Sequence, residues 1–116
     1  MTLVDTSIWV QHLRFGNHQL RSLLENGEVL CHPFIVGELA CGSMKNRDEV
    51  LNLLHALPVA LIAENEEVMR FLRERQLYGR GLGWIDLHLL VSASLSQAFL
   101  WTNDRALKKA AEAHVK

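Results

Sequence analysis

Four short apolar runs recur along this 116-residue chain, and each is followed by a segment with helical character. The runs comprise residues 1–4, 28–32, 58–63 and 98–102. Their apolar character is typical of strands that are buried on both faces. Strands that alternate with helices pair in parallel, and the helices then cover both faces of the sheet. The sequence therefore predicts an α/β fold in which a small parallel sheet lies between helical layers.

Capping and breaking residues delimit the helical segments between these runs. Thr6 or Ser7 suits the start of the first helix, and Asn17 and Asn65 suit the starts of two others. Pro33 fits the first turn of a further helix. The expected helices cover residues 6–14, 17–24, 33–42, 46–54, 65–77, 84–94 and 104–114.

The composition is typical of one soluble domain, which we expect to span residues 1–116. Hydrophobic residues make up 49% and charged residues 22%, as in ordinary globular proteins. No apolar run approaches the roughly 18–20 residues that a membrane helix needs, and the N-terminus lacks the pattern of a signal peptide. Cys31 and Cys41 have no CxxC spacing, which predicts reduced, partly buried thiols. A cytoplasmic protein is expected.

Charge gives no general preference for nucleic acid. Twelve Lys and Arg residues against thirteen Asp and Glu residues leave a net charge of −1, whereas proteins that hold nucleic acid mainly through charge are usually basic. A phosphate-containing partner would therefore need a metal ion or a local basic patch. Arg70, Arg73, Arg75 and Arg80 form such a local set. They are either a solvated helix face paired with nearby glutamates or a contact for an RNA backbone or a protein partner.

Four acidic residues lie beside or within apolar segments. Asp5 follows the first apolar run and Asp104 follows the last one, each at the start of a helix. If the two strands are parallel, both side chains emerge at the same edge of the sheet. Glu38 in FIVGELACG and Asp86 in GWIDLHLLVSA have apolar neighbours, and such acids are rarely fully buried without a partner. Asp86 and Asp104 also suit the first turn of a helix as capping residues.

Four carboxylates in one cleft would repel one another and would resist ionising together. A divalent cation removes that penalty. Mg²⁺ and Mn²⁺ prefer oxygen ligands, and Mg²⁺ is commonly bound by a few carboxylates together with substrate phosphates. Such an ion can polarise a phosphodiester and activate water. The sequence therefore predicts that Asp5 faces a cation from solution, although spacing alone leaves the geometry of the site open.

Segments of the chain resemble the PIN-domain family, and specifically its VapC-type toxin ribonucleases. They are LVDTSIW, HPFIVGELACG, GRGLGWIDLHLLVSA and FLWTNDRAL, in the family's order. The resemblance implies a PIN-like three-layer α/β/α fold and Mg²⁺- or Mn²⁺-dependent endonucleolytic hydrolysis of RNA. It also implies the role of toxin in a toxin–antitoxin pair. The implied partners are an RNA substrate and a VapB-type antitoxin, with a homodimer or a larger toxin–antitoxin assembly expected.

The resemblance assigns roles to individual residues. The family's catalytic and metal-binding quartet matches Asp5, Glu38, Asp86 and Asp104. Asp5 and Asp86 are expected to be the surest metal ligands. Thr6 and Thr102 match the supporting hydroxyl positions beside the acids. Arg70, Arg73 and Arg80 become candidate contacts for RNA or the antitoxin.

Two departures from the family pattern carry expectations of their own. Asn103 stands where some relatives have an additional acid, which leaves open whether one or two metal ions are bound. The chain ends at HVK, before most of the final edge strand that such domains often have. The stability of the core or the contacts of a dimer are expected to differ as a result.

Two other functions fit parts of the sequence. One is a catalytically silent interaction module that binds antitoxin or nucleic acid. The other is a different phosphoryl-transfer enzyme that uses Asp5, although the VDTS segment lacks the DxD pair of such phosphatases. Among the remaining residues, His32 and His88 lie near the expected cleft, and Trp84, beside a glycine-rich turn, suits either packing or base stacking.

Overall fold

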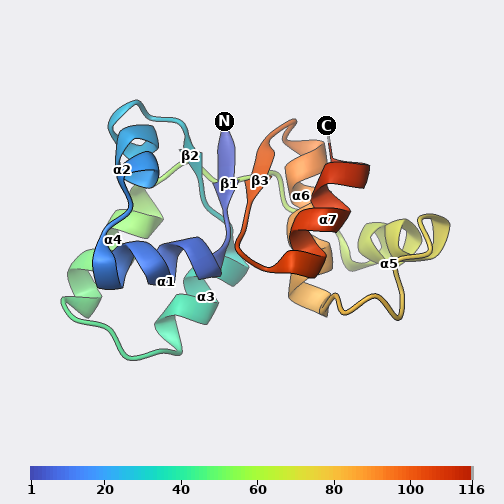
Figure 1. Cartoon of the computed structure of the whole chain (residues 1–116), viewed down its shortest axis with the longest axis horizontal. Helices are drawn as coiled ribbons and strands as arrows, with labels where there is room; N and C mark the ends of the chain where they lie inside the picture. Colours follow the sequence, from blue (N-terminus) through green and yellow to red (C-terminus); the bar gives the residue numbers. More distant parts are fainter. Residues whose placement is uncertain (116) are drawn as a thin grey trace.

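The computed structural model describes residues 1–115 of the chain, which form three strands and seven helices (Figure 1). In chain order the elements are β1 (Thr2–Val4), α1 (Thr6–Phe15), α2 (His18–Glu25), β2 (Val29–Leu30), α3 (Pro33–Ala40), α4 (Arg47–Ala56), α5 (Asn65–Glu74), α6 (Trp84–Leu95), β3 (Phe99–Trp101) and α7 (Arg105–His114). No helix within these residues is long and apolar enough to cross a membrane.

The strands form a small parallel sheet in the order β2-β1-β3. Leu3 in the central strand pairs with Leu30 on one side and with Leu100 on the other. All three strands run in the same direction, so their carboxyl ends lie at the same edge of the sheet, which is the lower edge in Figure 1. The predicted parallel α/β arrangement is confirmed.

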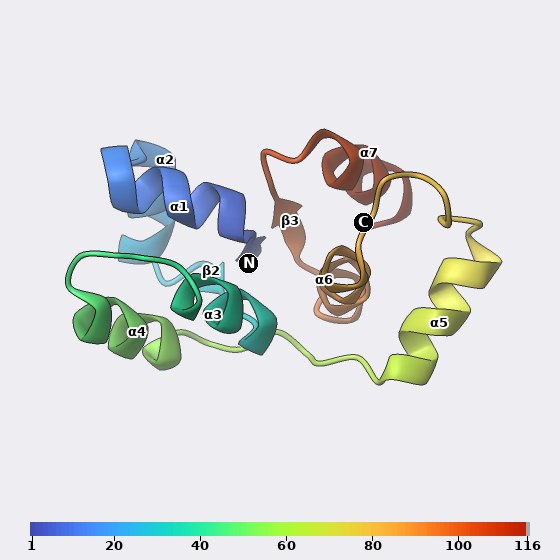
Figure 2. The same ribbon diagram turned by 90° about the horizontal axis from the view of Figure 1, so that it is seen from below.

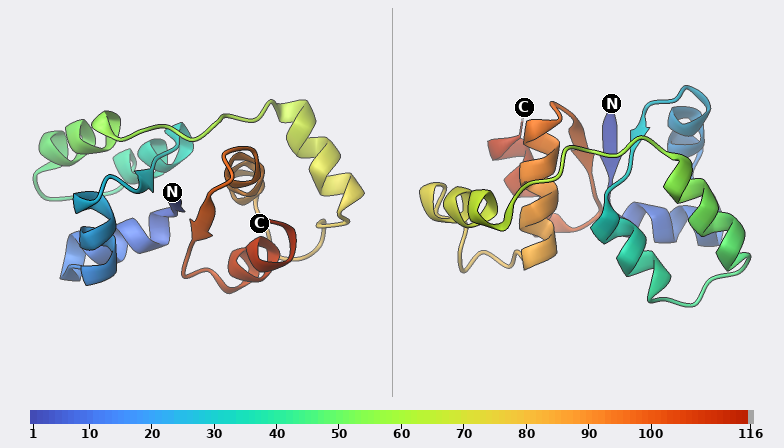
Figure 3. Two further views of the ribbon diagram at one scale, coloured as in Figure 1. Left: turned by 90° about the horizontal axis from the view of Figure 1, so that it is seen from above. Right: turned by 180° about the vertical axis from the view of Figure 1, so that it is seen from behind.

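Helices cover both faces of this sheet. Viewed from below in Figure 2 and from above in the left panel of Figure 3, α1, α2 and α7 lie on one side and α3, α4 and α6 on the other. Helix α5 lies at the outer end, next to α6. The core between the layers includes Leu3, Trp9, Leu89 and Leu107, which are all fully buried. The expected three-layer α/β/α fold is therefore present.

The strand expected over residues 58–63 does not form. Val59 makes a single parallel bridge to Cys31, with hydrogen bonds of 2.8 and 2.9 Å on either side of it. The chain then leaves the sheet, because the Leu61 N–H donates to the Ser96 hydroxyl at 2.9 Å instead of to a strand. The β2 strand is also only two residues long. Hydrophobicity thus identified a segment that meets the sheet at a single bridge and not as a strand.

Helix starts differ from prediction at two places. Glu64, not Asn65, is the N-cap of α5, and its N–H donates a hydrogen bond of 3.0 Å to Glu67 Oε1. Neither Thr6 nor Ser7 caps α1, because Asp5 occupies the N-cap position and makes no capping hydrogen bond. The hydroxyl groups of Thr6 and Ser7 point instead to the acidic residues described below.

The remaining boundary predictions agree closely with the structure, whereas neither cysteine has the partial burial that the sequence predicted. Asn17 caps α2 by accepting a hydrogen bond from the Leu20 N–H. The helix expected over residues 65–77 ends at Glu74, shortly before Gln76 takes a left-handed conformation with φ of 53°. Cys31 is buried and Cys41 is exposed, and both are free thiols.

Candidate active site

The ends of β1 and β3 bring two of the predicted acids to the same edge of the sheet. Asp5 directly follows β1, and Asp104 immediately precedes α7. Asp86 lies in the first turn of α6, which begins on this side of the sheet, and Glu38 lies near the end of α3. Figure 2 looks onto this edge and shows α1, α3, α6 and α7 arranged around the strand ends.

Two hydroxyl groups hold the carboxylate of Asp5. Thr102 donates a hydrogen bond of 2.7 Å to Asp5 Oδ2, and Ser7 donates one of 3.1 Å to the same oxygen. The two hydroxyl oxygens are 3.3 Å apart. Asp5 is only 7% exposed and Thr102 only 5%. Two hydrogen bonds to one oxygen fix the orientation of this buried carboxylate.

Asp104 and Asp86 are each anchored by the start of a helix. The Asp104 N–H donates to Thr102 Oγ1 at 3.0 Å, and Asp104 Oδ1 accepts from the Leu107 N–H at 2.9 Å. Asp86 Oδ2 accepts from the Gly83 N–H at 2.9 Å. The expectation that both acids suit helix starts is therefore confirmed. Helix-terminal contacts occupy one oxygen of each carboxylate.

Electrostatics links Asp86 to the other two acids. Burial is the main cause that raises the pKa of Asp86, and the negative charges of Asp104 and Asp5 raise it further. The hydrogen bond from Gly83 acts in the opposite direction. Both charged neighbours that shift this pKa are carboxylates, so Asp86 lies in a negative environment. Like charges that gather in this way favour binding of a cation.

Glu38, on α3, is joined to the acidic site by a hydrogen bond from a hydroxyl group. Thr6 donates a hydrogen bond of 2.7 Å to Glu38 Oε1. Thr6 directly follows Asp5, so this bond joins α3 to the start of α1 beside the acidic site. Glu38 itself is exposed. The structure thus places Glu38 at the solvent side of the site, held on one oxygen.

The donor chemistry suits a hard cation, although the carboxylates do not form a closed cage. In each of the four acids, one oxygen receives a protein hydrogen bond, and within residues 1–115 the other receives none. Among the described residues, no three Asp, Glu, His or Cys side chains lie close enough together to hold a metal by themselves. Mg²⁺ is commonly bound by one or two carboxylates while keeping several waters. An open, all-oxygen site of this kind fits such an ion.

Ser7 is a site residue that the sequence interpretation did not single out. Besides bonding Asp5, its hydroxyl oxygen accepts a hydrogen bond of 3.0 Å from the Asn103 N–H. It therefore ties the start of α1 to the loop between β3 and α7. The signal was present in the VDTS segment, where a hydroxyl two residues after an acid can either cap the helix or bond the acid. Sequence alone does not choose between the two.

Within residues 1–115, the candidate basic contacts make no hydrogen bond to the acids. Arg70 and Arg73 are exposed on α5, at the outer end of the molecule in Figures 1 and 2. Arg75 packs over the ring of Phe71 at 4.8 Å and contacts His114 Nδ1 at 3.2 Å. Arg80 is exposed in the glycine-rich turn. The acidic site thus receives none of its hydrogen bonds from these arginines.

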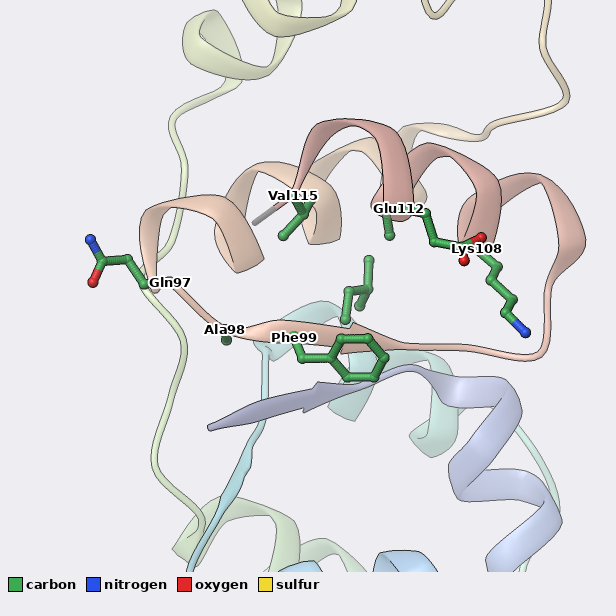
Figure 4. Close-up of a pocket in the computed structure, with 8 residues that line it drawn as sticks. Gln97, Ala98, Phe99, Lys108, Glu112 and Val115 are labelled. Carbon is green, nitrogen blue, oxygen red and sulfur yellow. The ribbon is translucent and has the colours of Figure 1, made fainter.

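A cavity of about 200 Å³ lies between β3 and α7 (Figure 4). Its lining includes Phe99 and Val115, with Lys108 and Glu112 at the α7 side. None of the four acids lines it. It begins at the amino end of β3, whereas the acids gather at the carboxyl end. This cavity is therefore separate from the candidate active site.

Comparison with known proteins agrees with this fold and sequence pattern. Residues 2–113 match the PIN domain family. Ribonuclease VapC32 from Mycobacterium tuberculosis strain CDC 1551 / Oshkosh is 48% identical over 111 residues, which cover 95% of this chain and 90% of that protein. The same values hold for Ribonuclease VapC32 from strain ATCC 25618 / H37Rv. The crystal structure of PAE2754 from Pyrobaculum aerophilum has a similar fold, with a TM-score of 0.60, 20% identity, and coverage of 91% of this chain and 76% of that one. The chain therefore belongs to the PIN-domain family and is of the VapC type.

Proposed function

We propose that this protein is a metal-dependent endoribonuclease and the toxin of a toxin–antitoxin pair. The observation that carries the proposal is the placement of Asp5, Asp86 and Asp104 at one edge of the sheet. Thr102 bonds both the Asp5 carboxylate and the Asp104 N–H, and the charges of Asp104 and Asp5 add to the burial that raises the pKa of Asp86. Repulsion between these carboxylates destabilises the folded protein when no cation is bound, and a divalent cation relieves it. Identity of 48% to proteins named Ribonuclease VapC32 supports RNA as the substrate.

The residues of the site have different roles in the proposed reaction. When bound, Mg²⁺ or Mn²⁺ supplies Lewis-acid stabilisation of the phosphodiester and lowers the pKa of water. Asp5 and Asp86 are the principal ligands, and Asp104 contributes its second oxygen. Ser7 and Thr102 hold the Asp5 carboxylate in position.

Glu38 is proposed to help bind the ion or to orient the attacking water, and it suits both roles because it is exposed and held on one oxygen by Thr6. Water, not a ribose hydroxyl, is then the nucleophile. In-line hydrolysis by water is expected to leave a 5′-phosphate and a 3′-hydroxyl on the RNA fragments.

The proposed partners follow from the same assignment. A VapB-type antitoxin would bind and silence the nuclease, and the pair would act in the cytoplasm. Arg70 and Arg73 share the exposed side of α5 and are proposed contacts for the antitoxin or for RNA. We also propose a homodimer as the working form, within a larger assembly when the antitoxin is bound.

Cleavage of single-stranded RNA by purified wild type and by Asp5→Asn tests the proposed activity. Wild type is expected to cut in Mg²⁺ or Mn²⁺ and to stop in EDTA. Asp5→Asn is expected to lose more than about 100-fold in rate, since changes to outer-shell partners alone often cost 10- to 100-fold. Asp48→Asn is the matched control, because Asp48 is exposed on α4. Equal cleavage by Asp5→Asn, or unchanged cleavage in EDTA, would refute the proposal.

A further inference from the structure

Three aromatic side chains form a fixed layer between α3 and α6. The ring of His88 lies edge-on to Trp84, with centroids 4.8 Å apart and an interplanar angle of 80°. It lies edge-on to Phe34 as well, at 4.9 Å and 69°. His88 is 2% exposed, whereas Trp84 is 41% and Phe34 36% exposed. The buried His88 therefore holds two partly exposed aromatic rings in place.

These rings lie within one helical turn of two of the acids. Phe34 precedes Glu38 by four residues on α3, so the two share a helix face. Trp84 begins α6 and shares its first turn with Asp86 two residues later, although side chains at this spacing leave the helix in different directions. The layer thus connects the two helices that carry Glu38 and Asp86.

Gly37 leaves open space on the same face of α3. It lies three residues after Phe34 and is exposed in the middle of the helix. A methyl group added there would meet no atom within 4 Å, and no left-handed backbone requires glycine at this position. Glycine inside a helix is unfavourable relative to alanine. The protein's own packing does not explain this glycine, whereas close approach of a ligand would.

The charge of the site favours a ligand contact that is neutral. The four carboxylates repel phosphates, and the whole chain has a net charge of −1, so general attraction to an RNA backbone is weak. Stacking of a base on an aromatic ring needs no positive charge and tolerates any base. Exposed aromatic rings beside an acidic site are therefore suited to a contact that does not depend on charge.

We propose that Phe34, Gly37 and Trp84 form a platform on which an unpaired base of single-stranded RNA stacks next to the acidic site. This inference rests on the proposed function, because it takes RNA as the substrate. Trp84 supplies the more exposed ring, Phe34 extends the surface along α3, and the missing side chain at Gly37 lets the base or its ribose approach the helix. The platform positions the RNA and takes no part in the chemical step.

Binding of a fluorescein-labelled octauridine in EDTA tests the platform without any cleavage. Trp84→Ala is expected to weaken binding by about 5- to 150-fold, the range for loss of one stacked base. Trp84→Phe is expected to retain most of the affinity. Phe15→Ala is the matched control, because Phe15 is 83% exposed at the end of α1. Wild-type tryptophan emission is expected to change more on RNA binding than the emission of Trp84→Phe, which keeps the buried Trp9 and the partly buried Trp101.

Gly37→Ala is a second test variant, and a loss of RNA binding in this variant could not be attributed to a destabilised fold. It is expected to raise the thermal midpoint by roughly 2–5 °C and yet to weaken RNA binding. Affinity for the RNA within twofold of wild type for both Trp84→Ala and Gly37→Ala would overturn the proposal. An equal loss of RNA affinity in Phe15→Ala would also overturn it. So would variants of the platform that bind the RNA normally and lose binding only to a protein partner. Because this binding is measured in EDTA, where no cleavage is expected, failure of the proposed cleavage is distinguished from failure of the platform.

Discussion

Hydroxyl groups near the N-terminus show that tertiary contacts determine the hydrogen-bond partners of single residues. Ser and Thr at a helix start usually satisfy backbone N–H groups. In this protein Ser7 instead bonds Asp5, and Thr6 bonds Glu38. The resemblance to the PIN-domain family predicted supporting hydroxyls at Thr6 and Thr102. The sequence could not predict the role of Ser7, because that role depends on β3 lying alongside β1.

His32 is a buried histidine at the N-cap position of α3. It is 1% exposed, and its Nδ1 accepts a hydrogen bond from the Phe34 N–H at 3.0 Å. The ring proton is therefore on Nε2, which has no hydrogen-bond partner within residues 1–115. Burial, and then the nearby His88, lowers the pKa of His32 to about 4. The folded protein thus favours the neutral ring.

This lowered pKa predicts that His32 makes the protein less stable in acid. The folded-state pKa lies below the unfolded value of 6.5, so the contribution to stability is complete above about pH 6.5 and is lost as pH falls toward 4. Between pH 7 and pH 5 we expect a loss of roughly 1–2 kcal/mol from this residue. Urea unfolding at both pH values measures it. His32→Asn, which keeps a capping side chain, is expected to reduce the loss, and the same loss in both proteins would contradict this account.

At the scale of elements, Asp104 combines a structural and a proposed catalytic task. Its Oδ1 caps α7 through the Leu107 N–H, while the second oxygen is proposed to bind a cation. The two substitutions Asp104→Asn and Asp104→Ala separate these tasks, because asparagine caps helices about as well as aspartate and alanine does not.

We expect Asp104→Asn to keep stability within about 0.5 kcal/mol of wild type and Asp104→Ala to lose about 1 kcal/mol. Both variants are expected to lose Mn²⁺ affinity, because neither carries the charge at that position. Urea unfolding and metal titration provide the two readings. Retained metal affinity in Asp104→Asn would show that Asp104 is only a cap.

Local sequence predicted the helices well and the edge of the sheet less well. Caps and glycine breaks are local signals, and α2 starts where Asn17 predicts. The apolar segment over residues 58–63 carries the same local signal as a strand. Whether it pairs depends on the two-residue length of β2 and on Ser96, which is far away in sequence. Pairing partners of this kind are not encoded in a local window.

At the scale of the whole molecule, the parallel sheet brings distant carboxylates together. Asp5 and Asp104 are 99 positions apart in the chain, yet Thr102 bonds both Asp5 and the backbone of Asp104. This convergence was predictable, because parallel strands end at one edge. The openness of the site was not, because side-chain geometry depends on the hydroxyls and helix ends that hold each acid.

Calorimetric titration of Mn²⁺ into the RNA-free protein at low ionic strength tests the central claim most directly. We predict saturable binding to wild type that is weakened at least tenfold in Asp5→Asn and in Asp86→Asn, because each removes one of the charges that make this pocket negative. Asp48→Asn is expected to bind as wild type does. Absence of Mn²⁺ binding to wild type, or equal binding to all four proteins, would contradict the account.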